Sequence, residues 1–169
     1  MNRQANRIAL GLAVMTASAV GGCSPLTIHI QGVGDVCKQH VRVDVMGVNW
    51  MEKQQWEKTP TPMQEYWAAG NRRREDSLAQ GYNYSARFGP TQPCEVVIKE
   101  ADPLWQTWNK RGATHFLVMF DTCTDANAWY VCLPLASKYW KGRTKNNVIE
   151  ISVEPSRVVA TTPPKPERK

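Results

Sequence analysis

The sequence predicts a mainly β protein, an antiparallel β-sandwich with short helical inserts. One stretch alternates strictly, with Val41, Val43 and Val45 on one side and Arg42 and Asp44 on the other. This pattern is typical of a strand with one buried face and one solvated face. Similar short segments recur along the chain between breaks rich in Gly and Pro, and such spacing favours a sandwich over a helical bundle.

Further strands are expected wherever apolar and polar residues alternate. Pro155 ends one of these segments, because proline cannot donate a ladder hydrogen bond. A hairpin is expected from the apolar stretches 114–121 and 128–135, with a polar tip between them. The other expected strands are residues 26–30, 82–88, 94–99, 148–153 and 157–160.

A helical insert is predicted near residues 49–81, between two strands. Asn49 suits an N-cap, Pro62 suits the start of a second short helix, and Gly70 suits its end. A separate helix should begin at Asp102-Pro103, since aspartate caps helices and proline is favoured at the first helical position.

The N-terminus has the layout of a secretory signal. Arg3 and Arg7 precede an apolar run, residues 8–15, which is too short to span a bilayer. Val20-Gly21-Gly22-Cys23 then resembles a bacterial lipobox, in which the cysteine thiol is joined to diacylglycerol. The resemblance implies a signal peptide of residues 1–22 and a lipid anchor on Cys23, with no transmembrane helix. The next residue, Ser24, is not aspartate, which by resemblance to enterobacterial lipoprotein sorting implies the outer membrane. The alternative is an ordinary secretory signal that leaves a free thiol.

Composition suits one domain over residues 23–160, followed by a basic, Pro-rich tail, residues 161–169, that is expected to be disordered. The formal charge is +6, from 21 basic and 15 acidic residues. Part of it belongs to the signal and the tail, so the field of the body is too weak to indicate nucleic-acid binding. Arg72, Arg73 and Arg74 are followed at once by acids and suit a solvated face.

Four cysteines remain beyond the anchor: Cys37, Cys94, Cys123 and Cys132. In an oxidising compartment they suggest disulfides, and three pairings are possible. A hairpin centred between residues 127 and 128 would place Cys123 opposite Cys132, within reach of a bond. Cys37 would then pair with Cys94. A metal site that uses these thiols with His40 or His115 is the alternative, although no paired C-x2-C spacing supports it.

The sequence lacks the common catalytic motifs. It has no H-E-x-x-H, no G-x-S-x-G and no phosphate-binding loop. Asp44 and Glu150 occupy polar strand positions and are expected to face solvent, and Asp121 and Asp125 suit a turn. The sequence therefore predicts a protein that is not an enzyme and has no cofactor, with a paired-carboxylate hydrolase as a minor alternative.

Seven tryptophans are the main compositional excess. They can bind the inserts to a small β core, or they can form an exposed surface for a protein or a sugar polymer.

The order of these elements resembles the TssJ family, small outer-membrane lipoproteins of the type VI secretion membrane complex. The resemblance lies in the lipobox, the strand around 40–45, the aromatic segment 63–67, the hairpin 114–131 and the last strand at 148–153. This chain differs from the family in its longer Trp-rich inserts, its four mature cysteines and a first loop that lacks Asn-Pro.

The resemblance implies a transthyretin-like sandwich whose first loop, residues 31–40, contacts an inner-membrane secretion protein through its periplasmic domain. A Cys37–Cys94 bond would stiffen this loop. The function predicted is therefore a structural lipoprotein at the periplasmic face of the outer membrane that docks a protein partner. The rival is a periplasmic glycan-binding lipoprotein that uses exposed tryptophans. The residues expected to contact the partner are Gln31, Val33, Asp35, Val36 and Lys38.

Overall fold

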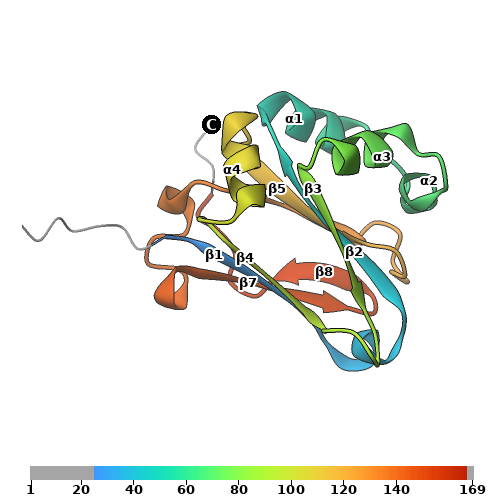
Figure 1. The fold of residues 1–169 in the computed structure, drawn as a ribbon. Coiled ribbons are helices and arrows are strands. Elements are labelled where there is room, and N and C mark those ends of the chain that lie inside the picture. Colours follow the sequence, from blue (N-terminus) through green and yellow to red (C-terminus); the bar gives the residue numbers. More distant parts are fainter. Residues whose placement is uncertain (1–24, 167–169) are drawn as a thin grey trace, which may run out of the picture.

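Two four-stranded β-sheets face each other in the computed structural model, which describes residues 25–166 (Figure 1). This arrangement confirms the predicted mainly β sandwich with short helical inserts. Sheet A has the order β4-β1-β7-β8, and sheet B has the order β3-β2-β5-β6. The strands are β1 (Thr27–Gly32), β2 (Val41–Val48), β3 (Asn83–Phe88), β4 (Glu95–Lys99), β5 (His115–Phe120), β6 (Tyr130–Pro134), β7 (Val148–Glu154) and β8 (Arg157–Ala160).

One strand pair departs from the antiparallel prediction. β1 runs antiparallel to β4 but parallel to β7, with Thr27 opposite Val148. The first and last long strands of the chain thus meet at the centre of sheet A. Alternation within a strand specifies which face is buried, but it says nothing about the direction of the neighbouring strand.

The core lies between the sheets and accounts for the alternation in the sequence. Ile28 and Ile30 of sheet A, and Val43 and Val45 of sheet B, are fully buried. β5 is buried at every position, because its second face is covered as well. A strand with two covered faces loses the polar alternation of a half-solvated strand.

The second cover on sheet B is the helical insert, as Figure 1 shows. It consists of α1 (Trp50–Lys58), α2 (Met63–Trp67) and α3 (Arg72–Ala79). Asn49 caps α1 as predicted: its side chain accepts from the Glu52 amide, and the Glu52 carboxylate accepts from the Asn49 amide. Within the described residues 25–166, sheet A has no comparable helical insert over its outer face.

The last α-helix of the described residues, α4 (Pro103–Lys110), has Pro103 in its first turn as expected and seals one end of the sandwich. Trp108 is fully buried, stacks on Phe116 and donates its indole N–H to the Tyr82 carbonyl at 2.8 Å. A Cβ on Gly47 would lie 2.4 Å from the Trp108 ring, so this position requires glycine.

Asp44 was expected to face solvent, and this prediction was wrong. The helical insert covers the Asp44 carboxylate and buries it completely. The Tyr66 hydroxyl donates to it at 2.9 Å, Arg74 Nε at 2.8 Å and Asn83 Nδ2 at 3.2 Å. Burial, and then the neighbouring Asp44 charge, raise the pKa of the Tyr66 phenol far above its ordinary value, so this tyrosine stays a donor. Glu150, the other strand carboxylate, is exposed as predicted.

The hairpin register is a second correction. Cys132 lies opposite Leu117, and the connection after Phe120 continues to Tyr130. The turn is therefore longer than expected, and Cys123 and Cys132 form no disulfide with each other. The Cys123 sulfur instead lies 3.0 and 3.1 Å from the carbonyl oxygens of Asp125 and Ser156, which share its single S–H donor. Burial raises its pKa, which favours the protonated thiol.

Six of the seven tryptophans are buried, which supports their structural interpretation. The exception is Trp50, whose exposed fraction is 53%. The tail to Pro166 has no helix or strand, yet it is held to the body. The Thr161 amide donates to the Glu150 carbonyl, and the Lys165 amide donates to the Tyr139 carbonyl.

Replacing Asp44 should test whether the insert depends on this carboxylate. We predict that Asp44→Ala lowers the free energy of unfolding by about 2–4 kcal/mol, because it leaves the Arg74 guanidinium and the Tyr66 hydroxyl with unsatisfied donors. Urea denaturation followed by tryptophan fluorescence measures it. The matched control is Glu150→Ala, an exposed strand carboxylate beside His29, which should cost less than about 1 kcal/mol. Equal losses would contradict the prediction.

Candidate protein-docking surface

The two ends of the sandwich carry different groups of connections. The chain enters β1 at Thr27, and β1 carries it to Gly32 at the opposite end. Six residues of strand span roughly 17–20 Å. At the far end lie the segment that follows β1, the β3–β4 turn, the connection after β5 and the turn between β7 and β8. We call the end at Thr27 the entry end and the other the loop end.

The loop predicted at residues 31–40 is shorter and more ordered than expected. Gln31 belongs to β1, and a short 3-10 helix, Gly34–Lys38, follows. The Val33 amide donates to the Val153 carbonyl at 2.9 Å, and the Gly32 amide donates to the Cys94 carbonyl at 2.9 Å. The start of this segment is therefore bonded to strands or strand ends on both sides.

Four of the five residues predicted to contact a partner are exposed, and one is not. Gln31, Val33, Asp35 and Lys38 are open to solvent, with Val33 43% exposed. Val36 is 2% exposed and belongs to the core, so its prediction as a contact residue was wrong. The 3-10 turn directs this one side chain inward, where it anchors the segment.

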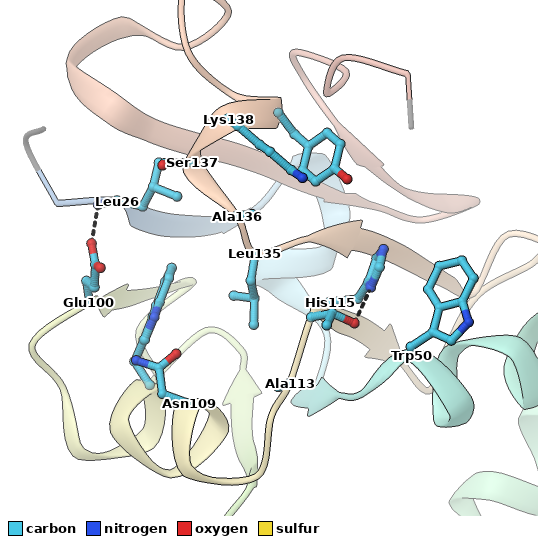
Figure 2. A pocket seen from close by; sticks show the side chains of 13 residues that line it. Leu26, Trp50, Glu100, Asn109, Ala113, His115, Leu135, Ala136, Ser137 and Lys138 are labelled. Carbon is cyan, nitrogen blue, oxygen red and sulfur yellow. Dashed lines mark hydrogen bonds between the residues drawn. The ribbon is translucent and has the colours of Figure 1, made fainter. Parts of the chain in front are cut away.

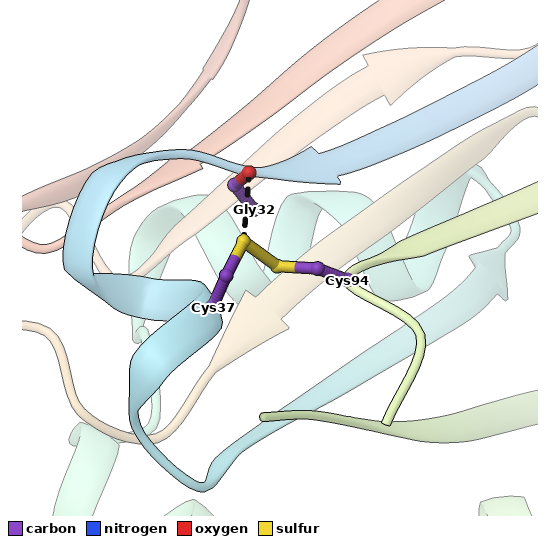
Figure 3. Close-up of a disulfide and its surroundings, with 3 residues drawn as sticks. All are labelled: Gly32, Cys37 and Cys94. Atoms are coloured by element: carbon purple, nitrogen blue, oxygen red, sulfur yellow. Dashed lines mark hydrogen bonds between the residues drawn. A yellow bond between two sulfur atoms is a disulfide. The ribbon is translucent and has the colours of Figure 1, made fainter. Parts of the chain in front are cut away.

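A disulfide joins Cys37 to Cys94, as the sequence analysis predicted (Figure 3). It ties the 3-10 helix to the residue just before β4. The Cys37 sulfur lies 3.3 Å from the Gly32 carbonyl oxygen. A Cβ at Gly32 would lie 2.4 Å from the Cys94 sulfur, so only glycine leaves room for the bond. Cys37 is therefore committed to this bond and not to the alternative metal site.

A cationic hollow borders this segment and was not found from sequence. It has a volume of about 320 Å³ and is lined by His40, Val41, Arg42, Arg87 and Asp121. Arg42 and Arg87 lie directly opposite each other on β2 and β3. Like charges in such a pair repel.

Only one of these two arginines is neutralised within the hollow. Arg42 donates from its amide and its Nε to the two oxygens of Asp121, at 2.9 and 2.6 Å, and its guanidinium also lies over the Trp67 ring. Arg87 is exposed and has no ion-pair or hydrogen-bond partner of its side chain among residues 25–166. The hollow thus has surplus positive charge suited to a carboxylate. Cross-strand pairing creates this site, and alternation alone does not reveal it.

A larger pocket lies at the entry end, and Figure 2 shows its lining. Its volume is about 570 Å³, and Leu26, Trp50, Trp105, His115 and Lys138 are among the residues around it. The Leu26 amide donates to the Glu100 carboxylate at 3.0 Å on its rim.

The described part of the chain contains neither a metal-binding cluster nor a membrane-spanning helix. Within residues 25–166, no group of three or more His, Cys, Asp or Glu side chains is placed to hold a metal ion. Over the same residues, no helix is both long and apolar enough to cross a membrane. Cys23 and the predicted signal peptide lie outside the residues described.

Comparison with known proteins finds no matching family model and no match among curated proteins. Among solved structures, the chain is similar to Serratia marcescens Lip, described as a membrane-bound component of the type VI secretion system. The TM-score is 0.46 at 11% identity, over 82% of this chain and 97% of that one. It is also similar to the type VI secretion lipoprotein TssJ1 of Pseudomonas aeruginosa. The TM-score there is 0.41 at 8% identity, over 85% and 98% of the two chains.

The disulfide should contribute measurable stability. We predict that Cys37→Ala with Cys94→Ala lowers the free energy of unfolding by about 3–4 kcal/mol, because the bond closes a loop between residues separated by 57 positions. Denaturation with and without reductant measures it: reduction should destabilise the parent and leave the variant unchanged. Peptide mapping without reductant should join Cys37 to Cys94. A peptide that joins Cys123 to Cys132 would contradict the structure.

Proposed function

We propose that this protein is an outer-membrane lipoprotein that docks a periplasmic protein, as a structural component of a type VI secretion membrane complex. The observation that carries this proposal is the disulfide-tied segment after β1, which presents exposed Val33, Asp35 and Lys38 at the end opposite the chain's entry. A lipid at the entry end then leaves the loop end directed away from the membrane.

The anchor is the diacylglycerol on Cys23, at the end of the lipobox-like sequence. One residue separates Cys23 from Pro25, where the described structure begins, so the sandwich starts almost directly at the membrane. The two acyl chains of a diacylglycerol hold a protein on a bilayer far more firmly than one chain does. The anchor and the loop end perform the function, and β1 sets the distance between them.

The partner contact is made by the loop end as a preorganised surface. Because the disulfide and the buried Val36 already order this segment, little conformational entropy is lost on binding. Val33 supplies an apolar contact, and Arg87 in the cationic hollow supplies a charge that fits an acidic side chain of the partner. The resemblance to the TssJ family makes that partner an inner-membrane secretion protein with a periplasmic domain.

A second candidate function uses the pocket at the entry end. Trp50 is the one tryptophan that remains exposed, and it lines the largest pocket described above. A glycan stacked on Trp50 would alter its fluorescence. A saturable change on titration with glycan fragments, absent in Trp50→Ala, would favour this function over docking.

Val33 provides a direct test of the docking surface. We predict that Val33→Asp weakens co-purification with the inner-membrane protein of the secretion complex by about tenfold or more, because it places a charge in an apolar contact. The matched control is Val97→Asp, since Val97 lies on the open face of sheet A with an exposed fraction of 46%, against 43% for Val33. The control should bind like the parent. Unchanged binding by Val33→Asp, or equal loss in both variants, would refute the docking surface.

Cys23 tests the anchor. We predict that Cys23→Ser moves the folded protein from the membrane fraction to the soluble fraction after a high-salt wash and abolishes secretion. Immunoblotting of fractions and a secretion assay measure these effects. Cys123→Ser is the control, because a serine hydroxyl can donate to the same carbonyls as the Cys123 thiol. Normal secretion by the Cys23→Ser strain would show that the anchor is incidental.

A further inference from the structure

All the charged residues in the segment between β6 and β7 are basic. From residue 133 to residue 149 the sequence has no Asp or Glu. The same stretch contains four basic residues, Lys138, Lys141, Arg143 and Lys145, and all four are exposed. A run of this kind has no local acid to neutralise it.

The C-terminal tail adds a fifth cation to the same region. The Lys165 amide donates to the Tyr139 carbonyl at 2.8 Å, which holds this part of the tail against the segment. Lys138, Arg143 and Lys165 then line one hollow of about 520 Å³, together with Tyr139 and Pro166. Among residues 25–166, no carboxylate lines this hollow. We call Lys138, Lys141, Arg143, Lys145 and Lys165 the cationic face.

This face lies at the entry end of the sandwich. Val148, the first residue after the segment, is directly opposite Thr27 in the parallel β1–β7 pair. Leu26 and Lys138 line the same pocket (Figure 2). In Figure 1 the orange segment that leads into β7 lies beside the start of β1. The connections at the loop end are on the far side.

Apolar side chains are exposed at the same end. Trp50, 53% exposed, lies on the rim of the pocket that Leu26 and Lys138 also line, and Met51 next to it is 73% exposed. These are the two most exposed large apolar side chains among the buried and exposed hydrophobics of residues 25–166. Tryptophan beside lysine and arginine is the combination enriched at membrane–water interfaces. One acid on the rim, Glu100, is engaged by the Leu26 amide.

We propose that the cationic face is a membrane-contact surface that binds the anionic headgroups of the leaflet in which the protein is anchored. The inference rests on the proposed function, which places a lipid on Cys23. Three residues of chain reach about 10 Å at most, so Leu26, which shares its pocket with Lys138, would lie within about a Debye length of the headgroups. Clusters of four to eight Lys and Arg next to a membrane-bound segment bind anionic lipids, and a basic patch adds to the membrane affinity of a lipid anchor.

Two contacts orient the molecule better than one. The acyl anchor alone would let the sandwich pivot about Cys23. Headgroup contacts at the cationic face would hold the entry end against the membrane and direct the docking surface into the periplasm. The effective concentration of that surface for a partner in the opposite membrane would rise as a result.

The test uses the chain from residue 23 with Cys23→Ser, so that binding reports the face without the lipid. In flotation assays this chain should bind vesicles of phosphatidylethanolamine and phosphatidylglycerol about tenfold or more tightly than vesicles of phosphatidylcholine. High salt should abolish the difference. Equal binding to both vesicle types, or binding insensitive to salt, would overturn the proposal, and neither measurement requires a further variant to fold.

A matched pair of variants then locates the contact. The variant Lys138→Gln, Lys141→Gln, Arg143→Gln and Lys145→Gln should lose this binding about tenfold or more. The control removes the same charge elsewhere, with Lys38→Gln, Arg72→Gln, Arg87→Gln and Arg157→Gln, and should bind far better. Equal loss in both would mean that net charge alone drives binding, and it would overturn the assignment of the face. Cys23 is replaced in every chain used here, so a negative result would not bear on the proposed anchor or docking surface. Those two proposals are tested separately, by the Cys23 fractionation and by the Val33 co-purification.

Discussion

The buried carboxylate of Asp44 is the contact on which the outer half of the molecule depends. It receives hydrogen bonds from Tyr66 of α2, Arg74 of α3 and Asn83 of β3, so that one side chain ties the helical insert to the sheet. An ion removed from water is stable only when its partners are held in place. The network therefore specifies where the insert lies, and the tryptophans packed around it supply the apolar area. Sheet B is closed as a consequence, while sheet A is left open.

The two sheets differ in whether a helical insert covers them, and the two ends of the sandwich differ as well. β1 runs from the entry end to the loop end and is paired on both sides, antiparallel to β4 and parallel to β7. A central strand of this kind is a stiff spacer. The segment that follows it is fixed by Val36 in the core and by the bond from Cys37 to Cys94. The surface proposed for docking is therefore rigidly placed with respect to the surface proposed for membrane contact.

The charges follow the same division. The cationic face at the entry end has no acid within its segment, whereas the cationic hollow at the loop end contains Asp121, which neutralises Arg42 and leaves Arg87 available. A diffuse cluster of flexible lysines suits a fluid array of headgroups. A single arginine beside a fixed ion pair suits one carboxylate in a defined geometry. The two basic sites thus fit different kinds of partner.

The sequence by itself determined the class of fold, the helices and most strand positions, because alternation, N-caps and prolines act within a few residues. Asn49 and Pro103 show this directly, since each occupies the helix start that its chemistry favours. The Cys37–Cys94 bond was predicted as the pair that remained once Cys123 was placed opposite Cys132. That companion bond is absent, because the turn after β5 is longer than its polar residues indicated, so the correct pairing followed from an incorrect register. Only the tertiary structure decided that Asp44 and Val36 are buried and that β1 pairs in parallel with β7. It also decided that Arg42 lies opposite Arg87 and that Lys165 lines the same hollow as Lys138. Each depends on which distant segments become neighbours, and that choice is made by packing across the whole chain rather than by local pattern.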